Sequence, residues 1–519
     1  MNLRKSNWTL VVALALCATV AIAQDQKQDT SPIDPNAPLQ PLPPLDTSPS
    51  GGNANKPPIG AARGVTGPYD PQPYDPAQVT PDQNTLAGVA PLTLGSIQHT
   101  QNIFDPAISF SLLGQTYPNT TGPSTLIGTS VISGSLNFDR TWSRYHFTTL
   151  YNGGEIFNLG YGGANSTFGS VPAYYQFHDL IVTQEVNWAR WHILLRDDFM
   201  ASPYAAFAGQ GMGGPGLVAQ FSSMLGAALN SFGQEFLPTE NINTGAAMHY
   251  RNAVLGQAEY SFSRRSAFTF AGSYGLLHFT EPGFVSSTML DAQAGYDYLL
   301  DPSNSIAILA SYGKIDYTGT LPPTTGTSTT GTSTIGTGAS TTDYMGALAY
   351  GRKITGRLAF QVAAGPERII SAGAGGIGNF QLWNASISSA LSYEKRRGGV
   401  SFNFMRGLNP GSGVFLGALS NTTSGTAHYQ FTRYWTGSVN SGYSLDNSLA
   451  PAGTATTQFD TWFIGANLGR RVGTHAQVNF NYGVLKQNSP PNCPVTICGI
   501  PGFQQTFGMT VNLHLRPTG

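Results

Sequence analysis

The segment Thr506-Phe507-Gly508-Met509-Thr510-Val511-Asn512-Leu513-His514-Leu515 decides the fold. Its large apolar side chains occupy every second position, and Gly, Thr, Asn and His lie between them. Successive side chains of a β-strand point to opposite faces, so this strand has one apolar face and one polar or small face. Segments of about ten residues with this alternation are typical of membrane-spanning β-barrels, in which lipid and lumen lie on opposite sides of each strand. The segment therefore predicts one strand of a transmembrane β-barrel.

The same two-residue period recurs along the chain, for example in residues 358–364, 383–393 and 475–484. Short polar turns, many of them rich in arginine and aromatic residues, separate such segments at 139–144, 188–191, 262–265, 394–397, 432–434 and 469–471. Longer connections alternate with these turns at 153–173, 201–245, 318–342, 409–424, 447–457 and 488–502. We count about 18 antiparallel strands, with 14 to 18 compatible with the weaker segments. Short turns at one end and long loops at the other predict periplasmic turns and termini and external loops.

The composition agrees with a wall between lipid and water. Only 10% of the residues are charged and the net charge is −1, whereas roughly 25% of an ordinary soluble domain is charged. A coiled coil needs charged flanks and a nucleic-acid-binding protein needs a basic surface, so both classes are excluded.

Two segments precede the predicted barrel. Arg4 and Lys5 lie before an apolar run, and Ala21-Ile22-Ala23 offers a small-residue cleavage pattern, so residues 1–23 predict a secretory signal peptide. Residues 24–93 are rich in Pro, Asp, Gln and Gly and predict a disordered periplasmic tail. We therefore expect an all-β chain with three parts: 1–23, 24–93 and a barrel over 94–519.

From about residue 100 onward the chain resembles bacterial outer-membrane β-barrel proteins, porins among them. The segment Thr506–Leu513 looks like the signal by which the barrel assembly machinery recognises a final strand. The chain departs from that pattern because it ends in Arg516-Pro517-Thr518-Gly519, without a terminal Phe or Trp. The resemblance implies a Gram-negative outer membrane, contact with its lipid, and assembly by that machinery. A homo-oligomer of such barrels is compatible with the sequence.

Two of the long connections carry further signals. Apolar residues follow a helical spacing within 213–235: Leu217, Val218, Phe221, Met224, Leu225, Ala228, Leu229 and Phe232. In general porins the third long loop folds into the lumen, so this loop is either such a constriction or a cap over the mouth. Cys493 and Cys498 lie within the last loop and predict a local disulfide in an oxidising compartment.

The sequence contains none of the short motifs of serine hydrolases, zinc proteases or P-loop proteins, so we expect no enzyme, cofactor or metal site. The nine histidines are scattered, and each is interpreted as a polar lumen residue. Six charged residues fall on strand faces opposite the apolar stripes, where lumen charges would select ions and solutes, or form salt bridges that close the barrel. These pore-lining candidates are Glu185, Arg196, Arg251, Glu259, Asp291 and Asp297.

The leading hypothesis is a channel for passive diffusion of small hydrophilic solutes, because barrels of 16 to 18 strands enclose an aqueous channel. The alternative is a non-conducting surface or scaffold barrel that displays long loops and tethers a periplasmic partner through residues 24–93. An outer-membrane enzyme ranks third. A transporter driven by an energised inner-membrane protein is disfavoured because no globular plug precedes the strands.

Overall fold

The computed structural model describes residues 103–117, 125–159, 174–202, 242, 248–263, 265–281, 284–301, 303–319, 339–355, 357–372, 379–395, 397–411, 413–449, 458–488 and 502–515. The chain divides into two compact units, Met1–Gly64 and Val65–Gly519, and every described residue lies in the second. The expected signal peptide, tail, helical stripe and disulfide all lie outside the described residues. The described part contains no helix long and apolar enough to cross a bilayer.

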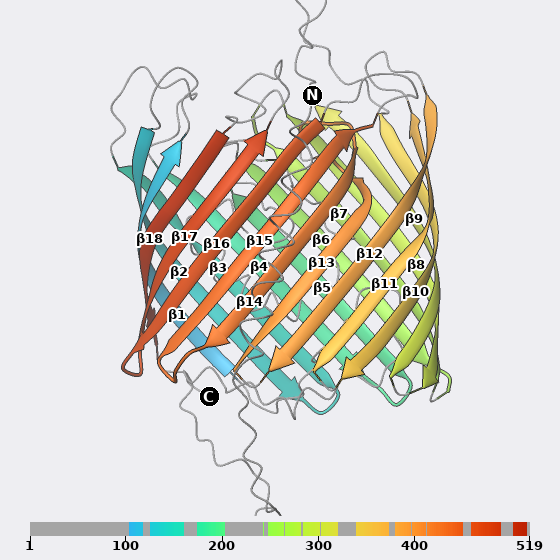
Figure 1. The fold of residues 1–519 in the computed structure, drawn as a ribbon, viewed down its shortest axis with the longest axis horizontal. Coiled ribbons are helices and arrows are strands. Elements are labelled where there is room, and N and C mark those ends of the chain that lie inside the picture. The colour runs from blue at the N-terminus through green and yellow to red at the C-terminus, as the bar shows by residue number, and fades with distance from the viewer. Residues whose placement is uncertain are drawn as a thin grey trace, which may run out of the picture. The chain divides into compact units, whose positions relative to one another are not determined.

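Eighteen strands make up the described structure (Figure 1). They are β1 (Ile103–Tyr117), β2 (Thr125–Trp142), β3 (Tyr145–Leu159), β4 (Tyr174–Asn187), β5 (Trp191–Ser202), β6 (His249–Ser261), β7 (Ser266–Phe279), β8 (Val285–Asp301), β9 (Asn304–Gly319), β10 (Ser340–Thr355), β11 (Leu358–Ala372), β12 (Phe380–Lys395), β13 (Gly398–Asn409), β14 (Ala418–Gln430), β15 (Trp435–Ser448), β16 (Gln458–Val472), β17 (Ala476–Asn488) and β18 (Gly502–His514). Each strand pairs antiparallel with the next one in the chain, and β18 pairs with β1. The sheet is therefore a closed up-and-down barrel, which confirms the expected fold class and strand count.

The closing pair, β1 and β18, joins residues about 400 positions apart. The register runs from Ala107 opposite His514 to Thr116 opposite Gln505. Side chains reinforce it: the Ser111 and Thr510 hydroxyls lie 2.8 Å apart, and His514 Nδ1 lies 3.1 Å from an Asp105 carboxylate oxygen. The C-terminal segment that predicted the fold is thus the strand that closes it.

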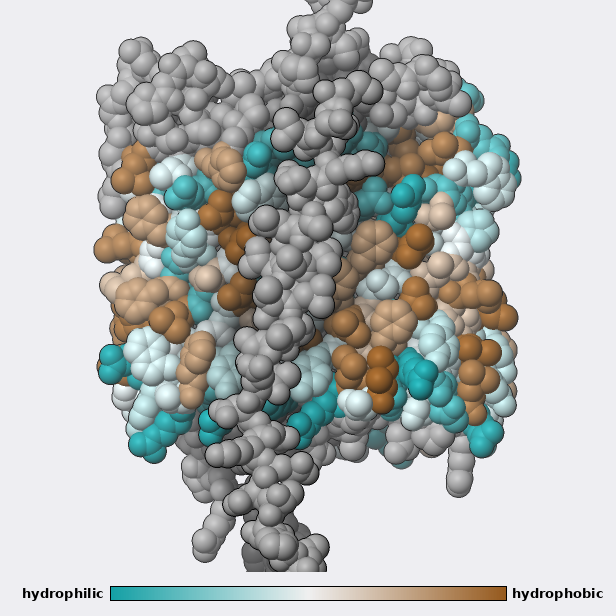
Figure 2. All heavy atoms as spheres, viewed as in Figure 1, coloured by the Kyte–Doolittle hydropathy of each residue, from teal (hydrophilic) through white to brown (hydrophobic). Residues whose placement is uncertain are grey.

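The two faces of the wall follow the two-residue period. In β1, Ile108, Phe110 and Leu112 are 42%, 47% and 59% exposed, whereas Ser109 and Ser111 between them are 4% and 3% exposed. In a closed barrel the exposed alternate residues face outward and the buried ones face inward. Figure 2 shows apolar side chains in a broad band across the near wall, with hydrophilic residues concentrated toward the rims. An apolar outer band of this kind matches the hydrocarbon of a bilayer.

The short turns all lie at one end of the barrel, called here the turn end; the opposite end is the loop end (Figure 1). Arginines at the turn end lie over aromatic rings. Arg140 stands 5.5 Å from the ring centre of Trp142, and Arg470 stands 5.2 Å from that of Trp435. This arrangement suits an interface between hydrocarbon and water, because a guanidinium can reach water while the ring remains in the apolar band.

Several expected connections are partly wrong: the expected turn 469–471 lies within β16, the expected loop 318–342 overlaps the ends of β9 and β10, and two loops differ more. Residues 153–159 belong to β3 and residues 418–424 belong to β14. The end of β3 was not predicted because the adjacent glycines Gly153 and Gly154 interrupt the alternation of apolar and polar side chains. The second was hidden because both faces of β14 are polar there, with Ser420 and Thr422 inward and Asn421 and Thr423 outward. A strand without an apolar stripe has no period-two signal in the sequence.

Candidate functional site

The inward face of the wall is the candidate site. Strand pairing places all six pore-lining candidates on this face. It puts Glu185 in β4, Arg196 in β5, Arg251 and Glu259 in β6, and Asp291 and Asp297 in β8. They do not form one cluster. Three separate groups result, each completed by residues that the sequence reasoning did not single out.

The first group is a buried ion-pair network on β5 and β6. Arg196 Nη2 lies 2.9 Å from Asp198 Oδ2, and Arg251 Nη2 lies 3.2 Å from Asp198 Oδ1. Asp198 and Arg251 are 4% and 6% exposed. Asp198 was missed in the sequence, although the period-two rule could have found it because it shares the face of Arg196. One carboxylate between two guanidiniums satisfies the charges that burial would otherwise make costly.

The second group is acidic and lies on β6, β7 and β8. Glu259 stands beside Thr269 of β7, whose hydroxyl donates to Asp297 Oδ2 at 3.3 Å. Closer to the loop end, the Ser273 hydroxyl donates to Asp291 Oδ2 at 3.4 Å. The structure therefore brings Glu259 and Asp297 together and leaves Asp291 apart from them.

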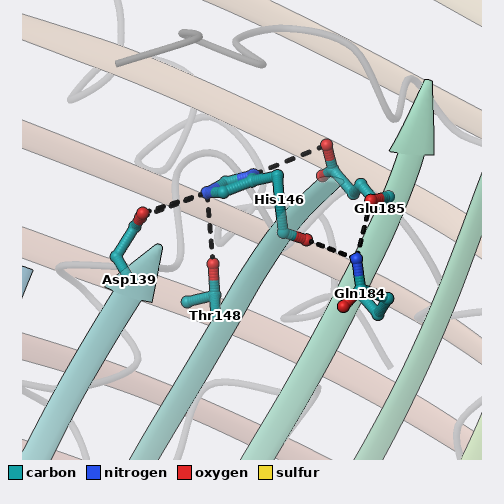
Figure 3. A network of polar contacts seen from close by, with 5 residues as sticks. All are labelled: Asp139, His146, Thr148, Gln184 and Glu185. Carbon is teal, nitrogen blue, oxygen red and sulfur yellow. Dashed lines mark hydrogen bonds and ion pairs between the residues drawn. The ribbon is translucent and has the colours of Figure 1, made fainter. Parts of the chain in front are cut away.

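The third group centres on His146 near the turn end (Figure 3). His146 Nε2 lies 3.2 Å from both carboxylate oxygens of Asp139 and 3.4 Å from the Thr148 hydroxyl. Its Nδ1 faces Glu185 Oε2 at 3.6 Å. Gln184 holds this corner from the outer face, since its Nε2 donates to the backbone oxygens of His146 and Glu185 at 3.2 and 2.8 Å.

This arrangement differs from a hydrolase triad. In a triad the acid and the nucleophile occupy opposite ring nitrogens, so that the histidine can act as a base toward the nucleophile. Here both nitrogens of His146 face carboxylates, and the Thr148 hydroxyl shares Nε2 with Asp139. The geometry is that of a bridge between two acids.

At the loop end, residues 409–411 and 413–417, called here the inserted segment, contact the inward face of the wall. It leaves β13 and reaches β8, where Val285 N donates to Gly413 O at 2.8 Å. Gly411, Gly413 and Gly417 have φ values of 86°, 77° and 86°, a region that glycine enters without strain. The sequence reasoning missed this segment. Three glycines around a short apolar run were the available signal.

Apolar packing holds the inserted segment. Val414 and Phe415 belong to one buried cluster with Ile242, Leu277, Phe279, Phe284, Ala418 and Phe459. Phe415 and Phe459 meet edge to face with ring centres 5.3 Å apart. Asn409 anchors the segment's start, because its Nδ2 donates to Asp446 Oδ1 at 3.1 Å and its Oδ1 accepts from Gly411 N at 2.7 Å. The segment thus packs against inward residues of β7 and β16 at the loop end.

Metal binding finds no support within the described ranges, where no group of three or more His, Cys, Asp or Glu side chains could hold an ion.

Comparison with known proteins gives structural matches only. No protein-family model matches the chain, and no curated protein sequence matches it. Among solved structures, OccAB3 of Acinetobacter baumannii matches with a TM-score of 0.37 and 9% identity, over 79% of this chain and 99% of that one. OccK2 (OpdF) of Pseudomonas aeruginosa matches at 0.38 and 11%, over 80% and 100%. A BenF-like porin from Pseudomonas fluorescens Pf-5 matches at 0.38 and 9%, over 80% and 99%. These similarities are too low to transfer solute preference, activity or oligomeric state.

Proposed function

We propose that the protein is a porin-like channel in a Gram-negative outer membrane, for passive diffusion of small hydrophilic solutes. The observation that carries the proposal is the closed barrel of 18 strands with an apolar outer band and a polar inward face. Barrels of this size leave an aqueous channel between their walls. The short turns and both termini would face the periplasm, and assembly would depend on the barrel assembly machinery.

The inward charges would set which solutes pass. Arg196, Arg251, Glu259 and Asp297 are fixed to a rigid wall by the strand register, and charged side chains lining a channel select ions by sign. Solutes would enter past the inserted segment at the loop end. Selectivity would then depend on the wall charges, and the size limit would depend on the inserted segment.

Conductance in planar bilayers tests the proposal. The purified full chain should produce stepwise current increments, and replacing Arg196 with Gln should shift the reversal potential in a salt gradient toward cation preference. Arg470→Gln is a matched control, because Arg470 lies beside Trp435 at the turn end and faces outward. A chain that inserts as a folded barrel and gives no increments would overturn the channel. An equal shift in both variants would overturn the role of the inward charges.

One observation favours the alternative, a non-conducting scaffold barrel: the inserted segment packs in a fully apolar cluster at the loop end. Deleting residues 24–90 separates the two functions. A channel keeps its permeability after the deletion, whereas a scaffold loses its periplasmic partner.

A further inference from the structure

The seam between β12 and β13 is incomplete. Their ladder runs from Lys395 opposite Gly398 to Ile387 opposite Arg406 and ends there. Beyond that point β12 continues to Phe380 paired with β11, and β13 continues to Asn409 paired with β14. The two strands therefore diverge toward the loop end on the same side on which β13 leads into the inserted segment (Figure 1).

Arg406 bridges the opening with its side chain. Its Nε and Nη2 donate to Asn384 Oδ1 on β12 at 3.3 and 3.0 Å, and its Nη1 donates to Asn421 Oδ1 on β14 at 3.3 Å. Asn384 in turn donates to Glu367 Oε2 at 3.0 Å, on the inward side. The contacts of this guanidinium are thus neutral amide oxygens, in contrast to Arg196 and Arg251, which bind a carboxylate directly.

A groove of about 720 Å³ lies over this seam. Its sides are Ala364, Pro366, Trp383 and Ile387, and its polar floor is Asn384 and Arg406. The four apolar residues share the outward face, and Trp383 is 64% exposed. A concave, mostly apolar site with a few placed polar groups is the usual form of a small-molecule pocket.

The position of the groove on the outer wall indicates the chemical class of ligand that it would bind. On β12 the outward residues between the groove and the turn end include Leu391 and Tyr393, both exposed and apolar or aromatic. The groove therefore opens into the lipid-facing band. An arginine in that band needs compensation on its lipid-facing side, because a cation in hydrocarbon is strongly disfavoured and the carboxylate that interacts with it, Glu367, lies on the inward face. An acidic head group supplies it, since carboxylate and phosphate oxygens bind the guanidinium fork in pairs.

A second guanidinium flanks the same surface. Arg368 lies opposite Trp383 in the register and donates from Nη2 to Gln381 Oε1 at 3.0 Å. Its Nε is buried and has no hydrogen-bond acceptor in the described structure. The outer wall thus offers two arginines, both bonded to amides, beside one apolar groove.

We propose that this groove binds an acidic amphiphile from the membrane, with its carboxylate or phosphate on Arg406 and its chain along Trp383 and Ile387. The groove opens on the outer face, and its polar floor reaches the inward Glu367 through Asn384. A free fatty acid and an anionic phospholipid share the required chemistry.

Quenching of Trp383 fluorescence measures the binding. The full chain is placed in phosphatidylcholine nanodiscs and titrated with dibromostearate, its methyl ester, or brominated phosphatidylglycerol. The Trp383 contribution is obtained by subtracting the signal of Trp383→Phe. Saturable quenching by dibromostearate or brominated phosphatidylglycerol, with none by the ester, supports the site, and the more potent of the two acids identifies the source. Equal quenching by the ester overturns it.

Variants separate a specific site from simple partitioning. Arg406→Gln should weaken binding about tenfold or more, as expected for loss of a charge-assisted contact. Arg470→Gln, which removes an outward arginine beside the half-buried Trp435, should leave the Trp383 signal unchanged. Ala385→Leu keeps Arg406 and fills the groove, so it should also weaken binding and serves if Arg406→Gln does not fold. Unchanged affinity in Ala385→Leu, or in a folded Arg406→Gln, overturns the proposal.

Discussion

The two ends of the barrel interior are built differently. Toward the turn end and the middle of the wall, inward side chains such as His146, Asp198 and Glu259 are polar and linked by ion pairs and hydrogen bonds. Toward the loop end, Leu277, Phe279 and Phe415 form an apolar cluster around the inserted segment. Ion pairs between neighbouring strands hold these polar groups, as in His146–Glu185 and Arg251–Asp198. An apolar segment that joins two strands depends on packing, which a single substitution can disturb.

From this difference we expect the two ends of the barrel interior to affect different properties of the channel. We expect substitutions at the loop end to change conductance and stability together. Substitutions among the wall charges should change stability and ion preference but leave the size limit alone.

The largest effect is expected from Gly413→Val. At φ 77° a β-branched residue is strained, and its Cβ would overlap the Phe279 ring. The inserted segment should leave its cluster, which raises single-channel conductance and lowers the free energy of unfolding by about 3 kcal/mol. Gly473→Val is the matched control, because φ is 70° and no atom lies within 4 Å of the added Cβ. Its strain should cost stability without any change in conductance; equal conductance in both variants would show that the segment does not restrict the channel.

Arg251→Gln should have the next largest effect. It removes one of two cations from buried Asp198, and breaking a buried ion pair leaves charge uncompensated. Because Arg196 remains, we expect a loss of about 2 kcal/mol in urea unfolding. Lys314→Gln is the comparison, since the Lys314–Asp316 pair is exposed on the outer face and its loss should change stability much less. Similar losses in the two variants would contradict the buried network.

Asp446→Asn tests the polar anchor of the inserted segment. Asp446 is 1% exposed and accepts from the Ser420 and Ser444 hydroxyls, both at 2.6 Å, and from Asn409 Nδ2. An amide cannot accept all three bonds, so we expect a loss of about 1 kcal/mol and noisier open-channel current. If Asp446→Asn shows no added current noise and the same free energy of unfolding as the original protein, apolar packing alone holds the inserted segment.

The smallest effect is expected from His146→Ala near the turn end. The half-buried contacts to Asp139 and Glu185 should contribute about 0.5 kcal/mol in total, with conductance unchanged. Thr148→Val, which removes only the 3.4 Å contact, should be neutral in the same unfolding measurement. A conductance change in His146→Ala larger than that in Gly413→Val would reverse the comparison between the two ends.

Much of the architecture was predictable, because alternation is a local property. The segment 506–515 predicted strand β18, and the same period placed Glu185, Arg196 and Asp297 on one face of the wall. The contacts that each inward side chain makes with residues of neighbouring strands were not predictable. Whether Arg251 meets Asp198 or another acid depends on the offset between β5 and β6, which the closure and shear of the barrel decide.

Two features arise where the regular pattern stops. The Arg406 groove exists because the ladder between β12 and β13 ends at Ile387 and Arg406. In the sequence, the inserted segment resembles the other loops that connect neighbouring strands, here β13 and β14.

The sequence by itself determined that this chain forms a wall of β-strands with an apolar outer face. A two-residue period in hydrophobicity determines whether each side chain lies on the outer or the inner face of that wall. Only the tertiary structure decided what the inward residues meet. Contacts such as that between Gly413 and Val285 join parts of the chain more than a hundred residues apart, and they form only once the sheet has closed.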